Sequence, residues 1–378
     1  MTLTRGARTT GAVLCAVLGV IAAGWIVRDL RAVGDPPDLL RYWAGYTDAL
    51  PKALPATSQG DLVLLVVQVL TAFAALRSRV AASALVATGV VTFALRLPGV
   101  WTIGASWMDG RYGDELRTRA LIGTFVTLAA ALALIVTGSA GRRQPTDGYE
   151  PRPTRPGRGA AVTAFLVLGA SGAVLIAWEV RQFLTFPSRL YPGWFIGSGT
   201  VRVELTGAPP GWSGVALGLI CLVVASTALF RAVHARPLGM IAAGFLLVSG
   251  AFGIARAEHH QLLDRFGDLG TEYQLVVLTS FLLALTGATA LLALARRGLE
   301  EADGRDQGHD GYGYPPQGPG YGYPPQGPGY GYPSPDEPGY GRPGTGQPGQ
   351  GPGYGYPQGG QPGGGFGPPP PASPPPGW

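Results

Sequence analysis

The side chains that could do chemistry gather in one short polar stretch, residues 256–272. Within it, Glu258, His259, His260 and Asp264 are residue types that bind zinc or transfer protons. If the preceding helix continues outward, His260 and Asp264 lie four residues apart on one helical face. A zinc enzyme would still need a third protein ligand and an open coordination position, and no recognised zinc-enzyme motif surrounds these residues. We therefore expect a solvated helix end here, with a metal site as the alternative.

No other motif in the chain points to catalysis. The apolar part has no GxxxxGK[ST], no GxSxG and no dinucleotide fingerprint, and the Gly-rich stretches of the C-terminal tail lack the strand and helix that those motifs need. Cys15 and Cys221 fall inside apolar runs, where a thiol packs like a small hydrophobic side chain. We therefore assign no catalytic, cofactor-binding or metal-binding residues, and we expect neither a cofactor nor an enzyme.

The elements that must position these residues are long apolar runs. Of the 378 residues, 46% are hydrophobic and only 13% are charged, whereas a soluble domain is typically about a quarter charged. The runs do not alternate between apolar and polar positions, so they predict helices rather than a barrel. Each is close to the length needed to cross roughly 30 Å of hydrocarbon. We expect eight transmembrane helices, at 11–27, 61–76, 80–95, 120–137, 160–178, 212–230, 238–255 and 273–294.

A polar linker, residues 138–159, separates the fourth and fifth runs. It carries five arginines (142, 143, 152, 155 and 158) against Asp147 and Glu150, and its Pro and Gly residues interrupt any continuous helix. The N-terminus and the short connections are also rich in arginine. The four longer loops hold nearly equal numbers of basic and acidic residues. The positive-inside rule therefore predicts a cell-membrane protein with both termini and the linker in the cytoplasm.

The two halves of the chain resemble each other. An offset of 153 residues superposes Gly19, Trp25, Val27 and Arg28 on Gly172, Trp178, Val180 and Arg181. An offset of 157 residues superposes seven residues around the fourth run on seven around the eighth, including Gly113 and Glu115 on Gly270 and Glu272. Each half contains an even number of runs, so two such units would share one orientation and be related by an axis along the membrane normal. The alternative is two similar apolar blocks without a common origin.

The polar residues near the runs suggest two further roles. The Trp-x-Val-Arg pairs, Trp25 with Arg28 and Trp178 with Arg181, are typical of interfacial anchors with a snorkelling arginine, and binding of an acidic lipid headgroup or envelope component is the alternative. The run interiors hold no charged residue, and Asp61 and Glu179 are expected to reach water at the outer ends, which argues against proton-coupled transport. A path for a neutral solute would be lined by Gln68, Thr71, Thr124, Thr127, Thr279 and Thr286.

Two segments outside the runs have patterns of their own. Residues 200–205 alternate between apolar and polar side chains, which predicts a short strand or hairpin. From Gly311 the chain repeats GYGYPPQGP with a nine-residue period that later decays. This low-complexity tail has too few aliphatic residues to form a core, so we expect it to be disordered. It would act as a spacer or recruit cytoplasmic proteins.

Together these patterns predict an all-α integral membrane protein. Its eight transmembrane helices form two similar four-helix units in the same orientation, followed by a disordered Gly/Pro/Tyr-rich C-terminal tail. The expected domains are 1–137, 138–159, 160–297 and 298–378. We expect a non-enzymatic, envelope-associated scaffold or accessory factor. The first alternative is a transporter or channel for a neutral or weakly polar solute, and the second is an outward-facing enzyme using the cluster at 258–264. The expected partners are the lipid bilayer and cytoplasmic proteins that contact the tail, and no nucleic acid.

Overall fold

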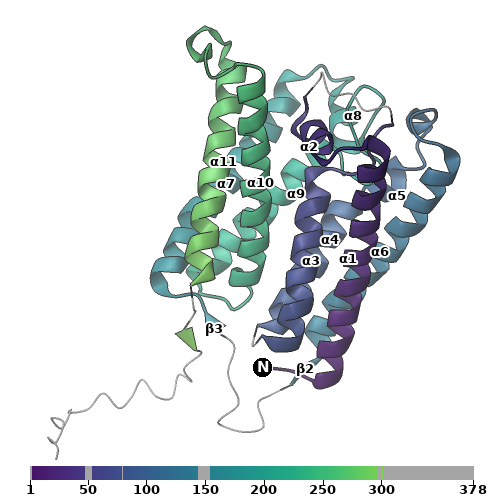
Figure 1. Ribbon diagram of the computed structural model, residues 1–378. Coiled ribbons are helices and arrows are strands. Elements are labelled where there is room, and N and C mark those ends of the chain that lie inside the picture. The colour runs from purple at the N-terminus through teal and green to yellow at the C-terminus, as the bar shows by residue number, and fades with distance from the viewer. Residues whose placement is uncertain (1, 47–52, 79, 144–153, 297–298, 301–378) are drawn as a thin grey trace, which may run out of the picture. The chain divides into compact units, whose positions relative to one another are not determined.

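The computed structural model describes residues 2–46, 53–78, 80–143, 154–296 and 299–300 (Figure 1). Of the tail expected to be disordered, 298–378, only Leu299 and Glu300 are described, and the prediction for the rest lies outside these residues. Within them, eight helices are long and apolar enough to cross a membrane, which confirms all eight predicted runs. Their bounds are α1 Arg5–Val33, α3 Gln59–Arg77, α4 Ala81–Arg96, α6 Asp114–Ala140, α7 Arg158–Thr185, α9 Pro210–Leu229, α10 Ala235–His259 and α11 Thr271–Ala295.

The helix ends follow from local sequence. Helix α1 begins where the hydroxyl of Thr4 accepts a hydrogen bond from the backbone N–H of Ala7, at 3.3 Å, and it ends at Gly34, whose φ of 97° favours glycine. Helix α3 begins at a capping box formed by Ser58 and Asp61. Helix α9 begins at Pro210, which needs no N–H at this position. The apolar runs thus extend into polar turns that terminate each helix.

The remaining elements are short. Helices α2 (Pro36–Ala44), α5 (Gly99–Thr102) and α8 (Tyr191–Ile196) and the 3-10 turns η1 (Ser106–Met108) and η2 (Phe266–Asp268) lie in the longer loops. Two-residue strands pair antiparallel near the ends of the helices: β1 (Thr2–Leu3) with β2 (Arg142–Arg143), and β3 (Thr154–Arg155) with β4 (Leu299–Glu300). We call this side of the molecule the linker end and the opposite side the cap end.

The prediction of a short strand or hairpin at residues 200–205 is wrong. These residues form turns and irregular backbone. The alternation that suggested a strand has another cause, because Val203 and Leu205 are buried against other loops while Arg202 remains exposed. A period of two in side-chain burial arises in any extended segment that covers a surface.

The eight helices pack as two rings of four (Figure 1). We call α1, α3, α4 and α6 the first bundle and α7, α9, α10 and α11 the second bundle. In the first, α1 contacts α3, α3 contacts α4, α4 contacts α6 and α6 closes on α1. In the second, α7, α9, α10 and α11 follow the same order. The counterparts by position in the ring are therefore α1 and α7, α3 and α9, α4 and α10, and α6 and α11.

The two bundles join through counterpart helices. Helix α4 contacts α10, and the crossed contacts α3 with α10 and α4 with α9 lie on either side. Val63, Leu64 and Val67 of α3 belong to the same apolar cluster as Phe245 and Leu246 of α10. The main core of the molecule is therefore shared between the bundles.

Counterpart helices bury the same faces. In the first pair, Cys15, Leu18 and Gly19 of α1 and Leu168, Ser171 and Gly172 of α7 are buried at an offset of 153 residues. Buried positions coincide at offsets of 153 for α3 and α9 and 154 for α4 and α10, as in Val67 with Ile220 and Gly89 with Ala243. For α6 and α11, the expected offset of 157 places the buried Leu128 on Leu285, which is 68% exposed. An offset of 156 superposes the buried faces instead, as in Thr124 with Ser280 and Leu134 with Ala290.

Candidate functional site

The loops at the cap end fold into a layer with its own apolar core, which we call the cap. Its buried members come from both halves of the chain: Ala56, Ile103, Met108 and Tyr112 precede the linker, and Val203 and Leu205 follow it. Burial in this layer raises the pKa of Tyr112 above its ordinary value. The segment 201–206, which leads into the second bundle, therefore lies against loops of the first.

The first polar anchor of the cap is Asp29, near the end of α1. Its carboxylate is fully buried and accepts hydrogen bonds from the backbone N–H of Thr57, at 2.7 Å, and from the Thr57 hydroxyl, at 2.5 Å. The guanidinium of Arg28 lies 2.7 Å away and also donates to the carbonyl of Leu54. These bonds fix the loop before α3, because a buried carboxylate needs every one of its partners.

The second anchor is Asp61, in the first turn of α3. The sequence suggested that Asp61 and Glu179 reach water, and this expectation is wrong: both are buried, Asp61 at 2% exposure. Asp61 accepts from the backbone N–H of Ser58, at 2.7 Å, and forms an ion pair with Arg96 of α4. The same arginine donates to the carbonyl of Thr206, and the Thr206 hydroxyl lies 3.2 Å from Asp61. The pair thus binds the 201–206 segment to the first bundle.

Beneath this anchor the interior of the first bundle is polar. Its buried residues include Gln68, Thr71, Thr88, Thr92, Thr124 and Thr127. Thr71 and Thr88 share a hydrogen bond of 2.7 Å, whereas the side-chain oxygens of Gln68 and Thr92 have no partner within the structure described. A cavity of about 20 Å³, lined among others by Gln68, Thr124 and Arg96, reaches the Asp61 anchor. This volume is enough for a single water molecule.

Towards the linker end the first bundle closes with apolar packing. Cys15, Leu18, Ala75, Leu85 and Leu134 form a buried cluster below the polar residues. The would-be Cβ of Gly89 lies 2.7 Å from the Ala131 carbonyl oxygen, so α4 and α6 approach closely here. The polar interior is therefore enclosed on both sides, by the cap above and by this cluster below.

The interior of the second bundle is apolar at the corresponding level. Ile220, Cys221, Val224, Leu246 and Leu283 fill it. Its buried polar side chains include Ser171 and Thr286, which share a hydrogen bond of 2.8 Å, and Ser280, whose hydroxyl donates to the Val276 carbonyl at 2.9 Å.

The six residues predicted to line one path are consequently divided. Gln68, Thr71, Thr124 and Thr127 lie in the first bundle, and Thr286 lies in the second. The sixth, Thr279, accepts a hydrogen bond from the indole N–H of Trp178, at 2.9 Å. The structure therefore does not bring the predicted set together.

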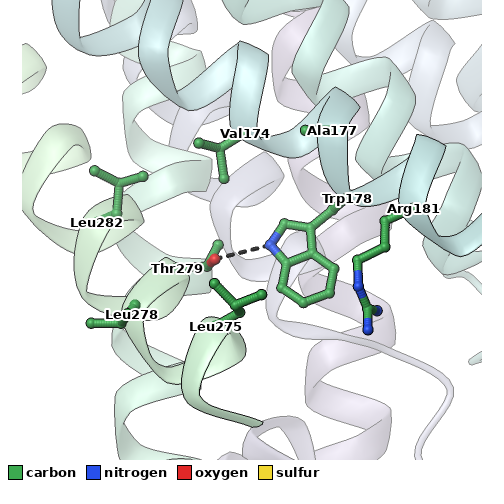
Figure 2. A pocket seen from close by; sticks show the side chains of 8 residues that line it. All are labelled: Val174, Ala177, Trp178, Arg181, Leu275, Leu278, Thr279 and Leu282. Carbon is green, nitrogen blue, oxygen red and sulfur yellow. Dashed lines mark hydrogen bonds between the residues drawn. The ribbon is translucent and has the colours of Figure 1, made fainter. Parts of the chain in front are cut away.

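The two Trp–Arg pairs have different surroundings. Trp25 lines the small cavity of the first bundle, and Arg28 is engaged by Asp29. Trp178 and Arg181 instead border an open groove of about 460 Å³ between α7 and α11 (Figure 2). The groove is otherwise lined by apolar side chains and Thr279.

The cluster at 258–264 does not assemble into a metal site. Helix α10 ends at His259, and Gln261 has a φ of 54°, so His260 and Asp264 do not share a helical face. The ring of His259 stacks on the ring of Tyr46, with 3.7 Å between the ring centroids. Across the described ranges, no group of three or more His, Cys, Asp or Glu side chains is placed to hold a metal ion. The geometry therefore offers no support for the outward-facing enzyme.

The Asp61, Arg96 and Thr206 anchor was missed from the sequence because its members are far apart in the chain. Asp61 and Thr206 are separated by 145 residues. The only local signal is the Ser58-x-x-Asp61 spacing, which is typical of a capping box. Comparison of the chain with protein-family models, curated proteins and solved structures finds no match. The structure itself establishes a helical protein with eight candidate membrane spans.

Proposed function

We propose that this multi-pass membrane protein works by binding rather than by catalysis, as a scaffold or accessory factor of the cell envelope. The observation that carries this proposal is the cap, in which loops from both halves share one apolar core. Loops that only connect helices would not need buried ion pairs such as Asp61 with Arg96. A layer fixed in this way presents a defined surface on one side of the membrane, as a binding platform requires.

The cap also links the two bundles. The Tyr46 hydroxyl donates to the Ala255 carbonyl of α10, at 3.2 Å, and Arg202 donates to the Tyr42 carbonyl of α2, at 2.8 Å. The Arg202 guanidinium lies 3.9 Å from the Tyr42 ring centroid. Each half therefore contributes a segment that rests on the other, which favours a rigid assembly over two bundles that rock against each other.

The same proposal includes two four-helix units derived from one duplicated unit. The equal ring order, the shared buried faces and the crossed contacts between α3, α4, α9 and α10 support it. Two contacts are especially informative. In the first bundle, Gly89 of α4 faces Ala131 of α6. In the second bundle, Gly287 of α11 faces Ala243 of α10. The two crossings therefore pair one glycine with one alanine at equivalent positions, but the glycine lies on the other helix of the pair.

We further propose that both termini and the linker are cytoplasmic and that the cap faces outward. Support comes from arginines at the linker end, including Arg5, Arg77, Arg142, Arg158 and Arg231. Single-cysteine labelling tests this orientation directly, because Cys15 and Cys221 are fully buried and can stay in place. An impermeant reagent applied to whole cells should label a cysteine at Leu40, on α2 in the cap, and not one at Phe230, at the linker end. Labelling at Phe230 and not at Leu40 would show that the cap faces the cytoplasm, opposite to the proposed orientation.

The scaffold proposal is tested by photo-crosslinking in native membranes. A photoreactive residue replaces Leu40, which is 46% exposed in the cap, or as a control Leu285, which is 68% exposed on the α11 surface. The cap position should give a discrete protein adduct that is lost when Asp29→Ala disrupts the loop beneath it. The control position should give lipid adducts. Identical lipid-only adducts from both positions would refute the scaffold.

The polar interior of the first bundle favours a second candidate, passage of a small neutral solute. The specific observation is the unpartnered side-chain oxygen of Gln68 beside the 20 Å³ cavity. Opening would require the 201–206 segment to leave Asp61 and Arg96. In proteoliposomes this candidate predicts flux of a small neutral solute that Thr206→Ala increases and Gln68→Leu abolishes. Equal flux in empty and protein-containing vesicles would eliminate it.

A further inference from the structure

An open groove lies between α7 and α11, with Trp178 and Arg181 on α7 and Leu275, Leu278 and Thr279 on α11 among its lining residues. Its volume of about 460 Å³ falls within the roughly 300–1,000 Å³ of small-molecule pockets. Both helices are candidate membrane spans, and the lining residues Leu275 and Leu278 are 41% and 55% exposed. The groove therefore opens sideways, onto the surface that the hydrocarbon of the membrane covers.

Arg181 lines one end of the groove, and Glu272 pairs with it there from the neighbouring helix. Arg181 lies near the end of α7, and Glu272 lies in the first turn of α11. A guanidinium nitrogen of Arg181 lies 3.3 Å from a carboxylate oxygen of Glu272, and their side chains are 33% and 52% exposed. A guanidinium has five N–H donors and a carboxylate has several acceptor positions, so this single contact leaves both groups able to bind a ligand.

The side chain of Trp178, which lines the groove, is fixed by a hydrogen bond. We call the apolar side chains that line the groove its floor. The indole N–H of Trp178 donates to the hydroxyl of Thr279, and this bond joins the two helices across the groove (Figure 2). The Arg181 guanidinium carbon lies 5.3 Å from the Trp178 ring centroid, within the range of a cation–π contact. A ligand that enters would meet side chains already oriented, which reduces the entropy lost on binding.

We propose that this groove binds one phospholipid with a zwitterionic headgroup that bears a primary ammonium. The acyl chain occupies the apolar floor, the phosphate is bound by Arg181, and the ammonium is bound by Glu272. Charge complementarity selects this class. Glu272 repels an anionic headgroup that carries no cation, and a quaternary ammonium has no N–H to donate to the carboxylate.

The first bundle supplies an internal control for this site. At the equivalent seam, between α1 and α6, Trp25 lies over Gly123 instead of a threonine. Arg28, the counterpart of Arg181, is turned to the buried Asp29. The cavity at this seam is lined by interior residues and holds only about 20 Å³. The same sequence pair therefore gives a lipid site in one bundle only.

Native mass spectrometry of the full-length protein in detergent tests the proposal, with phosphatidylethanolamine, phosphatidylglycerol and phosphatidylcholine of identical acyl chains as probes. We expect one phosphatidylethanolamine to bind at least about tenfold more tightly than either other lipid. Arg181→Gln should remove this preference by weakening phosphatidylethanolamine binding. Glu272→Gln should instead reverse the order in favour of phosphatidylglycerol.

The matched control is Arg119→Gln on α6, whose side chain is 69% exposed and pairs with Glu115. This variant should leave lipid binding unchanged, and thermal unfolding of all three variants should match that of the wild type, so that lost binding reports the site. Equal retention of the three lipids by the wild type would overturn the proposal. So would an unchanged preference in folded Arg181→Gln protein. The cap is untouched by these substitutions, so either outcome leaves the scaffold proposal standing.

Discussion

The two bundles share their ring order and their buried faces, yet the first has the more polar interior. Where the first bundle buries Gln68, Thr71, Thr88, Thr92 and Thr127, the second buries Cys221, Val224, Ala242, Leu246 and Leu283 at the corresponding positions. In lipid, helices associate by close packing and not by escape from water. The same architecture therefore forms around either interior. The polar residues of the first bundle are not required for the fold, which points to a role in binding.

The difference extends to the cap end. Asp61 and Arg96 correspond to Gly214 and Gly250 of the second bundle, so the buried ion pair of the first bundle has no counterpart at these two positions, and the pair of Arg181 with Glu272 at this end of the second bundle is partly exposed. The two glycines are instead packed closely: the would-be Cβ of Gly214 lies 2.4 Å from a carboxylate oxygen of Glu179. At these two positions the first bundle thus has a buried ion pair that binds a loop, and the second has glycines in close contact with neighbouring residues.

The largest effect is expected from breaking the ion pair of the first bundle. Asp61→Asn leaves Arg96, whose side chain is only 13% exposed, without its counter-charge. Removing one partner of a buried pair typically costs about 3–5 kcal/mol. Thermal unfolding in detergent should therefore show a large loss of stability, together with faster proteolysis of the 201–206 segment.

Glu115→Gln is the control for this experiment. It removes one partner of the Arg119 pair, whose side chains are 69% and 81% exposed. Such surface pairs contribute about 0–1 kcal/mol. Replacing both Asp61 and Arg96 by leucine should restore part of the stability, because no unpaired charge then remains. Equal unfolding temperatures for Asp61→Asn and Glu115→Gln would contradict the role of the anchor.

The second prediction tests whether the two bundles are equivalent at the close crossing of α4 with α6 and of α10 with α11. An alanine at Gly89 would place its Cβ 2.7 Å from the Ala131 carbonyl oxygen, and one at Gly287 would place it 2.8 Å from the Ala243 carbonyl oxygen. Overpacking of this kind costs about 1–3 kcal/mol. Both substitutions should lower the unfolding temperature by similar amounts. Gly24→Ala, which has open space around its Cβ, should not.

A double substitution sharpens this test. Ala243→Gly combined with Gly287→Ala gives the second bundle the arrangement of the first, with glycine on the earlier helix of the crossing. We expect it to be more stable than Gly287→Ala alone, because the smaller residue at position 243 lets the helices adjust. Additive effects of the two changes would indicate that the crossings are not equivalent.

The sequence predicted the helices well and the sites poorly, for physical reasons. A run such as 120–137 has one stable form in hydrocarbon, the helix, so its existence follows from composition. The burial of Asp61 depends on Arg96 and Thr206, which only the tertiary fold brings together. His260 and Asp264 do not share a helical face because α10 ends at His259. The positive φ of Gln261 accompanies this end, and no residue type in the sequence indicates it. Contacts made by loops across the two halves leave no periodic signal.

The third prediction concerns the unpartnered Gln68. A buried polar group without a hydrogen-bond partner costs about 1–3 kcal/mol, so Gln68→Leu should stabilise the first bundle by about 1 kcal/mol. Gln68→Cys, which installs the residue of its counterpart Cys221, should do so more weakly because it leaves more empty volume. Thermal unfolding in detergent measures both. Destabilisation by Gln68→Leu would mean that the amide has a partner in solution, such as a bound water.

The smallest effect is a pH dependence of the cap. Glu204 lies in the segment that crosses the first bundle, and burial raises the pKa of its carboxyl above the ordinary value of 4.5, while Arg202, 3.2 Å away, opposes that shift. Above pH 4.5 the native state therefore retains a proton that the unfolded chain has released. The free energy of unfolding should fall as the pH rises from 4.5 through the native pKa.

Glu204→Gln keeps a hydrogen-bonding side chain of similar shape and removes this titration. In the variant, the rate at which protease cleaves the 201–206 segment should no longer rise between about pH 4.5 and neutral pH, as linkage predicts for the wild type. Glu272→Gln is the control, because Glu272 lies on the exposed rim of the second bundle and should leave the wild-type slope in place. If the slope persists in Glu204→Gln, another group of the cap carries the titration. If the wild type has no slope, Arg202 compensates fully for the burial of Glu204.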